Sequence, residues 1–137
     1  MKTLTDTADA AALFERFAAR HRLSHSVKHA PVELCWLFPE QSGLTLPITL
    51  ALQNGDELSF GVGDFWSYFF PFPEVATEFE SIIDSWVTRA ARIAVYGGRG
   101  RVLEVLKDGK WRPAYSANRG FPMPARPRTF IQNAVPP

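Results

Sequence analysis

Two apolar runs with a period of two residues, separated by a short turn, constrain this fold more than any other feature. Apolar residues occupy alternate positions in both runs: Leu46, Ile48, Leu50 and Leu52, then Leu58, Phe60 and Val62. Such alternation is typical of strands that bury one face. Between the runs, residues 53–56 read Gln-Asn-Gly-Asp and indicate a hairpin turn.

The length of this turn can be predicted from the condition that both apolar rows lie on the same face of the sheet. A two-residue turn at Asn54-Gly55 would place the rows on opposite faces, because the side-chain period of a strand is two. A three-residue turn over 53–55 keeps them together, with Gly55 left-handed in a type I turn followed by a G1 bulge. The pairs that this register predicts are Leu50 with Leu58, Ile48 with Phe60, and Leu46 with Val62.

Three further strands are predicted on either side of a long helix. Apolar residues alternate from Val32 to Phe38, and Pro31 and Pro39 bracket this run, as proline does at strand ends. Near the other end of the chain, residues 102–106 and 111–115 predict a second hairpin with its turn at 107–109.

Two amphipathic helices are predicted from apolar stripes at three- and four-residue spacing. The first covers roughly residues 8–21. The second runs from Glu74 to about Tyr96, where Gly97-Gly98 would end it. The stripes consist of Ala10, Leu13, Phe14, Phe17 and Ala18, and of Val75, Phe79, Ile82, Ile83, Trp86, Val87, Ala90 and Ile93.

This order of elements, α-β-β-β-α-β-β, contains hairpins and no strand–helix–strand repeat. It predicts an α+β fold: a two-layer sandwich in which two helices cover one face of an antiparallel sheet of about five strands. A length of 137 residues suits one domain. We assign residues 1–116 to it and treat the proline-rich residues 117–137 as an extension that belongs to, or wraps on, the same domain.

Composition excludes several classes of protein. Apolar residues form 46% of the chain and charged residues 21%, as in globular domains, and one cysteine rules out a disulfide framework or a cysteine-rich zinc module. No secretory signal or run of about 18 apolar residues is visible, so we expect a cytoplasmic protein without a membrane partner. The net charge of +1 points to no polyanionic partner.

Three histidines and one cysteine are the candidate metal ligands and nucleophiles of this sequence. His21, His25 and His29 would converge on a metal only if one helix continued through them, and we expect it to end near Leu23. Cys35 lies in an apolar strand beside Glu33, which disfavours a thiolate, so we expect it to be buried and inert. We therefore predict no catalytic residue, metal or cofactor.

Two glycine-rich segments indicate turns or irregular backbone rather than ligand-binding loops. Residues 97–101, Gly-Gly-Arg-Gly-Arg, follow a helix and precede a strand, which is the reverse of the order in a phosphate-binding loop. Residues 61–64, Gly-Val-Gly-Asp, indicate a bulge or a close approach of the backbone to another group.

Charge is unevenly distributed along the chain. Residues 1–95 contain 7 basic and 12 acidic groups, and residues 96–137 contain 8 basic and 2 acidic groups. Basic groups with Trp111, Tyr115 and Phe121 among them would suit weak binding of single-stranded nucleic acid. The same groups would equally pair with the acidic first part of the chain or with an acidic protein.

The aromatic segment 65–72 has six aromatic side chains among eight residues, more than one strand face can bury. They either close an open end of the core or form a docking patch. Our first hypothesis is a non-catalytic, cytoplasmic protein-binding module, adaptor-like or immunity-like, that binds a partner or a second copy of itself. The predicted binding residues are Phe65, Trp66, Tyr68, Phe69, Phe70, Arg99, Arg101 and Trp111.

Two alternatives remain open. The chain would be a small-molecule binder or enzyme if an apolar pocket lay near Trp66 and Trp86, with Arg99 or Arg101 holding an anionic group. It would be a weak nucleic-acid binder if the basic C-terminal third formed one surface.

Overall fold

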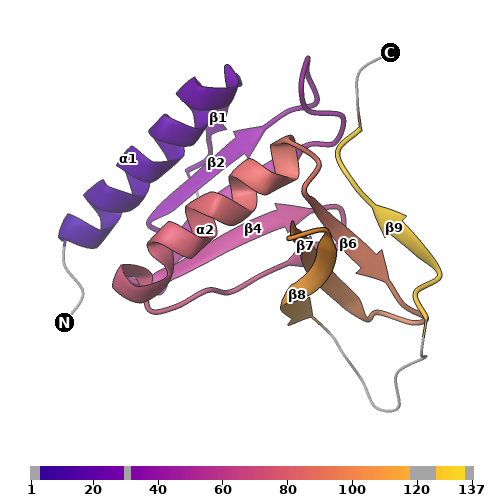
Figure 1. Cartoon of the computed structure of the whole chain (residues 1–137). Coiled ribbons are helices and arrows are strands. Elements are labelled where there is room, and N and C mark those ends of the chain that lie inside the picture. The colour runs from indigo at the N-terminus through magenta and orange to yellow at the C-terminus, as the bar shows by residue number, and fades with distance from the viewer. Residues whose placement is uncertain (1–3, 30–31, 118–125, 135–137) are drawn as a thin grey trace.

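The computed structural model describes residues 4–29, 32–117 and 126–134, which form two helices and nine strands (Figure 1). The helices are α1 (Leu4–His21) and α2 (Phe72–Val87). The strands are β1 (Ser26–Val27), β2 (Leu34–Phe38), β3 (Ile48–Gln53), β4 (Glu57–Val62), β5 (Phe65–Trp66), β6 (Ala91–Val95), β7 (Arg101–Lys107), β8 (Lys110–Ala117) and β9 (Thr129–Ile131). Neither helix is long and apolar enough to cross a membrane.

The strands form two antiparallel sheets, and the α+β class and the order of elements are confirmed. The first sheet has the order β1-β2-β3-β4-β5 and the second β8-β7-β6-β9, where the sequence led us to expect a single sheet. Both helices lie on one face of the first sheet, toward the viewer over β2 and β4 in Figure 1. The second sheet begins directly after α2 and packs against the same helix.

The core lies between the helices and the sheets, and the predicted stripes supply it. In α1 the buried residues include Leu13, Phe14 and Phe17, and in α2 they include Phe79, Ile83 and Trp86. The sheet residues that face the helices are also buried: Trp36, Phe38, Ile48, Leu50, Leu52, Leu58, Phe60 and Val62. Face-to-edge contacts such as Phe17 with Phe38 pack this interior.

An ion-pair network joins the exposed sides of the two helices. Arg16 and Arg20 of α1 both donate hydrogen bonds to the carboxylate of Glu80 on α2, at 2.8–3.2 Å. Arg20 and His21 also contact Asp84, each at 2.7 Å. The hydrogen bond from Arg16, reinforced by Arg20, holds the pKa of Glu80 below its ordinary value.

The predicted register of the first hairpin is wrong by two residues, although its faces are right. Leu50 pairs with Phe60 and Leu52 with Leu58, so the three-residue turn comprises 54–56. Asn54 and Gly55 both have positive φ, 52° and 81°, which excludes the predicted type I turn with its single left-handed glycine. A shift of two residues leaves every side chain on the same face, so alternation alone does not distinguish the two registers.

The second helix ends much earlier than predicted. Thr88 caps it, Arg89 adopts a left-handed φ of 67°, and Ala91–Val95 forms β6 instead of a further turn of helix. Apolar residues at 91, 93 and 95 fit a strand period, while those at 90 and 93 also fit a helical one. Pairing with β7 decides for the strand, and Gly97 and Gly98 therefore connect β6 to β7 rather than ending a helix.

The remaining differences concern short strands and the C-terminal extension. β1 and β5 have two residues each, too few for an alternating pattern. β9 lies in the extension and pairs with β6, so residues 129–131 are part of the second sheet. The second hairpin has the predicted strands, with a two-residue turn at Asp108-Gly109 and a bulge between Leu103 and Glu104.

Candidate functional site

The aromatic segment continues the edge of the first sheet. Trp66 pairs with Gly61 and Phe65 with Val62. Beyond β5, Ser67 donates its N–H to the Phe60 carbonyl at 3.1 Å, and Phe69 and Leu58 exchange two hydrogen bonds of 2.8 Å. Residues 65–69 therefore lie extended along β4, with side chains pointing to alternate faces.

This alternation divides the predicted binding residues into two groups. Phe65 and Phe69 are 1% and 7% exposed and contact the Tyr115 ring of β8, so they belong to the core and are removed from the predicted surface. Tyr68 and Phe70 are 44% and 57% exposed, and Trp66 is half-buried. We call Trp66, Tyr68 and Phe70 the aromatic ridge.

The first ring of the aromatic ridge is placed by a glycine. A Cβ atom on Gly61 would lie 2.6 Å from Cζ3 of Trp66, closer than carbon atoms can approach, so the indole requires the bare backbone there. The predicted close approach in residues 61–64 is confirmed at this position. Ser67 adds a buried bond, its hydroxyl oxygen accepting the Phe60 N–H at 3.0 Å, which ties the ridge segment to β4.

The aromatic ridge stands on the face of the first sheet that neither helix covers, which we call the helix-free face. Strand register places these side chains on it: Cys35, Leu37, Thr49, Ala51, Gln53 and Ser59. No described helix or strand packs against it. Cys35, Ala51 and Ser59 are buried among their neighbours, so solvent meets Leu37, Thr49, Gln53 and the aromatic ridge.

No charged side chain lies in the centre of the helix-free face. The charged residues on this side, Lys28, Glu33 and Glu57, lie beyond or at the ends of the strands. A sheet face exposed to water ordinarily alternates apolar residues inward with polar and charged residues outward. An uncharged centre with aromatic side chains and a charged periphery is instead typical of an interaction surface.

Arg101 lies away from this face and has a structural role. Its guanidinium donates to both oxygens of Asp64, at 3.1 and 2.8 Å, and to the carbonyls of Tyr96, Gly98 and Gly100. It thereby holds the β6–β7 loop against the β4–β5 turn. The bond from Arg101 lowers the pKa of the Asp64 carboxyl. Arg99 lies on the same loop and is exposed.

Trp111 belongs to a stack on the outer face of the second sheet. The Arg92 guanidinium lies between its ring and that of Phe130, at 4.1 and 3.9 Å from the centroids, and donates to Glu104 at 2.8 Å. Trp111 therefore does not share a surface with the aromatic ridge. The alternative of nucleic-acid binding relied on the basic and aromatic residues of the C-terminal third. Among them, Arg101 is paired with Asp64, and Arg119 and Phe121 lie outside the described residues.

The three histidines have different surroundings. His21 contacts Asp84, His25 stacks on Trp36 with centroids 4.0 Å apart, and His29 is exposed. Within the described parts of the chain, no three His, Cys, Asp or Glu side chains come together as a metal site would require. Cys35 is a free, buried cysteine, as predicted.

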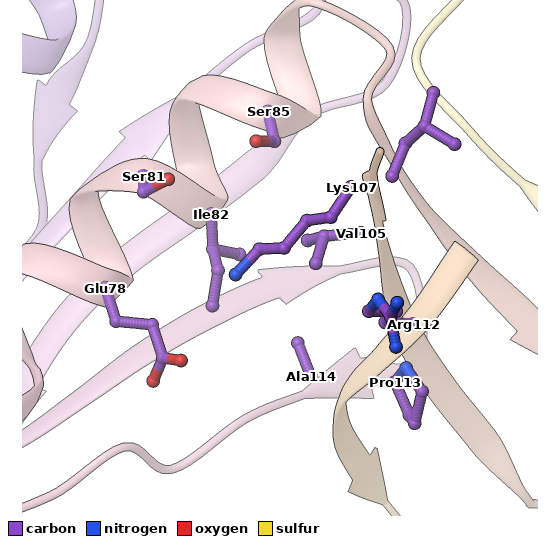
Figure 2. Close-up of a pocket in the computed structure, with 10 residues that line it drawn as sticks. Glu78, Ser81, Ile82, Ser85, Val105, Lys107, Arg112, Pro113 and Ala114 are labelled. Atoms are coloured by element: carbon purple, nitrogen blue, oxygen red, sulfur yellow. The ribbon is translucent and has the colours of Figure 1, made fainter. Parts of the chain in front are cut away.

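A pocket of about 320 Å³ lies between α2 and the β7–β8 hairpin (Figure 2). Ile82, Val105 and Ala114 give it an apolar surface, and Ser81 and Ser85 contribute hydroxyl groups. Sequence reasoning missed this pocket, because its walls are at least twenty residues apart in the chain. Trp86 is fully buried beside Phe60, and neither Trp86 nor Trp66 lines the pocket.

Charged side chains line the two walls of the pocket. Lys107 and Arg112 come from the hairpin and Glu78 from the helix, and Figure 2 shows Lys107 extending from β7 toward α2. None of these three side chains forms a hydrogen bond or an ion pair with another described residue.

Comparison of the chain with protein-family models, with curated proteins and with solved structures finds no match in any of the three.

Proposed function

We propose that this chain is a non-catalytic protein-interaction module that docks through its helix-free face, and that its partner is a second copy of the chain. The observation that carries the proposal is the uncharged centre of this face, bordered by the exposed rings of Tyr68 and Phe70. Interfaces are depleted of charge at their centre and enriched in aromatic residues. A cytoplasmic setting agrees with the single free cysteine.

A second copy fits this face better than a charged partner does. In a two-fold symmetric contact each surface meets its own copy, so a charged patch would repel itself. The centre of the helix-free face carries no charge and has no such penalty. Two antiparallel sheets pack face to face at a separation of about 10 Å, which would leave the two helices of each copy on the outside.

The size of the face sets the expected strength of the contact. The three inner strands have five or six residues each and the two edge strands two each. At about 4.8 Å between strands and about 3.3 Å per residue, the sheet spans on the order of 300 Å². A standard interface buries about 800 Å² per partner. We therefore expect a reversible, concentration-dependent dimer rather than an obligate one.

Sedimentation velocity over protein concentrations from about 1 μM to about 1 mM tests this proposal, since dissociation in that range corresponds to about 4–8 kcal/mol. We expect a monomer at the lower end and a growing fraction of dimer above it. The double variant Tyr68→Ser/Phe70→Ser should remain monomeric. Its matched control is Leu106→Ser/Phe130→Ser, which removes two similarly exposed apolar side chains, 40% and 43%, from the second sheet.

Circular dichroism is the control that checks whether both double variants keep the fold. A wild-type monomer at every concentration would overturn the assignment of a second copy as partner. A dimer that persists in Tyr68→Ser/Phe70→Ser, or that disappears in the control, would show that the helix-free face is not the contact.

A further inference from the structure

The pocket between α2 and the β7–β8 hairpin combines cationic side chains with apolar surface. Val105 pairs with Arg112 across the hairpin, so both lie on the face turned toward α2. Val105 is buried in the core, whereas Lys107 and Arg112 extend beyond it into the pocket. One wall is thus cationic, while Ile82 and Ala114 add apolar surface next to it.

Neither cation of this wall forms an ion pair with another described residue. Arg16, Arg20, Arg92 and Arg101 all form ion pairs with carboxylates. Lys107 and Arg112 form none, although Glu78 lines the same pocket. Two cations and one carboxylate leave a net charge of +1 there, which suits a ligand with a single negative charge.

We propose that this pocket binds a small organic carboxylate with an apolar body. The carboxylate lies between Lys107 and Arg112, where charge-assisted hydrogen bonds hold it. The apolar body packs on Ile82, Val105 and Ala114. Glu78 disfavours ligands with several phosphate groups, because it repels the additional negative charges.

The volume of the pocket limits the size of the ligand, and the exposure of its two cations limits the affinity. The volume of about 320 Å³ is at the low end for ligand pockets, about 300–1,000 Å³, and accommodates one ring with a short side chain rather than a nucleotide. Lys107 and Arg112 are exposed, so solvent and salt screen their charges. We expect dissociation constants near about 1 mM, or about 4 kcal/mol of binding free energy.

The test follows amide chemical shifts of the full chain during titration with 3-phenylpropanoate. Saturable shifts should centre on residues 81–85, 105–107 and 112–114. Two probes isolate the parts of the ligand: 3-phenylpropanol lacks the charge, and inorganic phosphate lacks the apolar body. Each should bind at least about tenfold more weakly than 3-phenylpropanoate, because 3-phenylpropanol loses the charge-assisted hydrogen bonds and phosphate loses the apolar contacts.

Single substitutions test whether Lys107 and Arg112 bind the carboxylate of the ligand. Lys107→Gln and Arg112→Gln should each weaken 3-phenylpropanoate binding about tenfold, and Glu78→Gln should strengthen it. Lys110→Gln is the matched control, because Lys110 lies at the same hairpin turn but does not line the pocket. No saturable binding, equal binding of phosphate, or unchanged affinity in Lys107→Gln and Arg112→Gln would overturn the proposal. This site is independent of dimer formation, and Tyr68→Ser/Phe70→Ser should bind the probe normally.

Discussion

The Trp66 ring lies against the backbone of Gly61, its cross-strand neighbour on the helix-free face, so closely that a β-carbon on Gly61 would come within 2.6 Å of Cζ3. The absence of a side chain at Gly61 therefore determines where the aromatic ridge begins. Because Tyr68 and Phe70 follow at alternate positions, their placement depends on the same strand pairing.

Gly61→Ala should displace the Trp66 ring and lower the free energy of unfolding by about 1–3 kcal/mol, the usual cost of overpacking. Chemical denaturation measures the loss, and the indole N–H chemical shift of Trp66 reports the displacement. In the background of Trp66→Ala the same substitution should cost much less, because the clashing ring is gone. Equal costs in both backgrounds would show that the ring is not the obstacle.

Arg101 should stabilise the fold more through the β6–β7 loop than through its ion pair. Arg101→Ala leaves the Tyr96, Gly98 and Gly100 carbonyls without this donor and should cost about 2 kcal/mol. Asp64→Asn should cost less, since the Asp64 side chain is 65% exposed and water replaces the lost contact. Urea unfolding compares the stability of the two variants. A larger loss of stability in Asp64→Asn would show that the ion pair contributes more than the hydrogen bonds to the loop.

The Glu80 network predicts a specific dependence of stability on pH. The pKa of Glu80 is lowered in the folded state, chiefly by its bond to Arg16. Its stabilisation is therefore complete above the ordinary value of 4.5 and is lost as pH falls through the lower folded value. Because the two arginine side chains are 54% and 41% exposed, we expect only about 0.5–1 kcal/mol.

Urea unfolding of wild type and Glu80→Gln at about pH 7 and about pH 3 measures this contribution, since most carboxylates are protonated at the lower value. The stability difference between them should be present at the higher pH and nearly absent at the lower one. Glu15→Gln on α1, which removes a carboxylate that has no ion pair with another described residue, should show no such change. A difference that persists at low pH would show that the ionised form of the Glu80 carboxyl is not its cause.

The salt dependence of the dimerisation constant should distinguish the proposed uncharged contact from a contact between charged residues. The centre of the helix-free face is uncharged, so raising sodium chloride from about 0.05 M to about 0.5 M should change the dimerisation constant by no more than about twofold. Sedimentation equilibrium at both salt concentrations gives this ratio. Loss of the dimer at high salt would indicate that charged residues make the contact.

The parts of the fold that follow from side-chain period were predictable, and those set by pairing were not. Alternation in β3 and β4 placed Leu50 and Phe60 on one face, but registers two residues apart share that pattern. For residues 90–95 the helical and strand periods both fit, and pairing with β7 decides between them.

The same limit applies to the candidate site. Both faces of segment 65–70 carry aromatic residues, so the sequence marks the segment as unusual but does not distinguish Phe65 and Phe69 from Tyr68 and Phe70. The hydrogen bonds of Phe69 to Leu58 make that distinction. The pocket was beyond prediction, because Glu78 and Arg112 line one pocket only when α2 and the second sheet pack together.

The most direct test of the central claim detects contacts between two copies of the chain. In a mixture of isotope-labelled and unlabelled protein at about 1 mM, where a weak dimer forms, isotope-filtered NOE spectra record only contacts between copies. We predict NOEs from the rings of Tyr68 and Phe70 to side chains of the helix-free face on the other copy. Intermolecular NOEs confined to other surfaces, or none at this concentration, would contradict the claim.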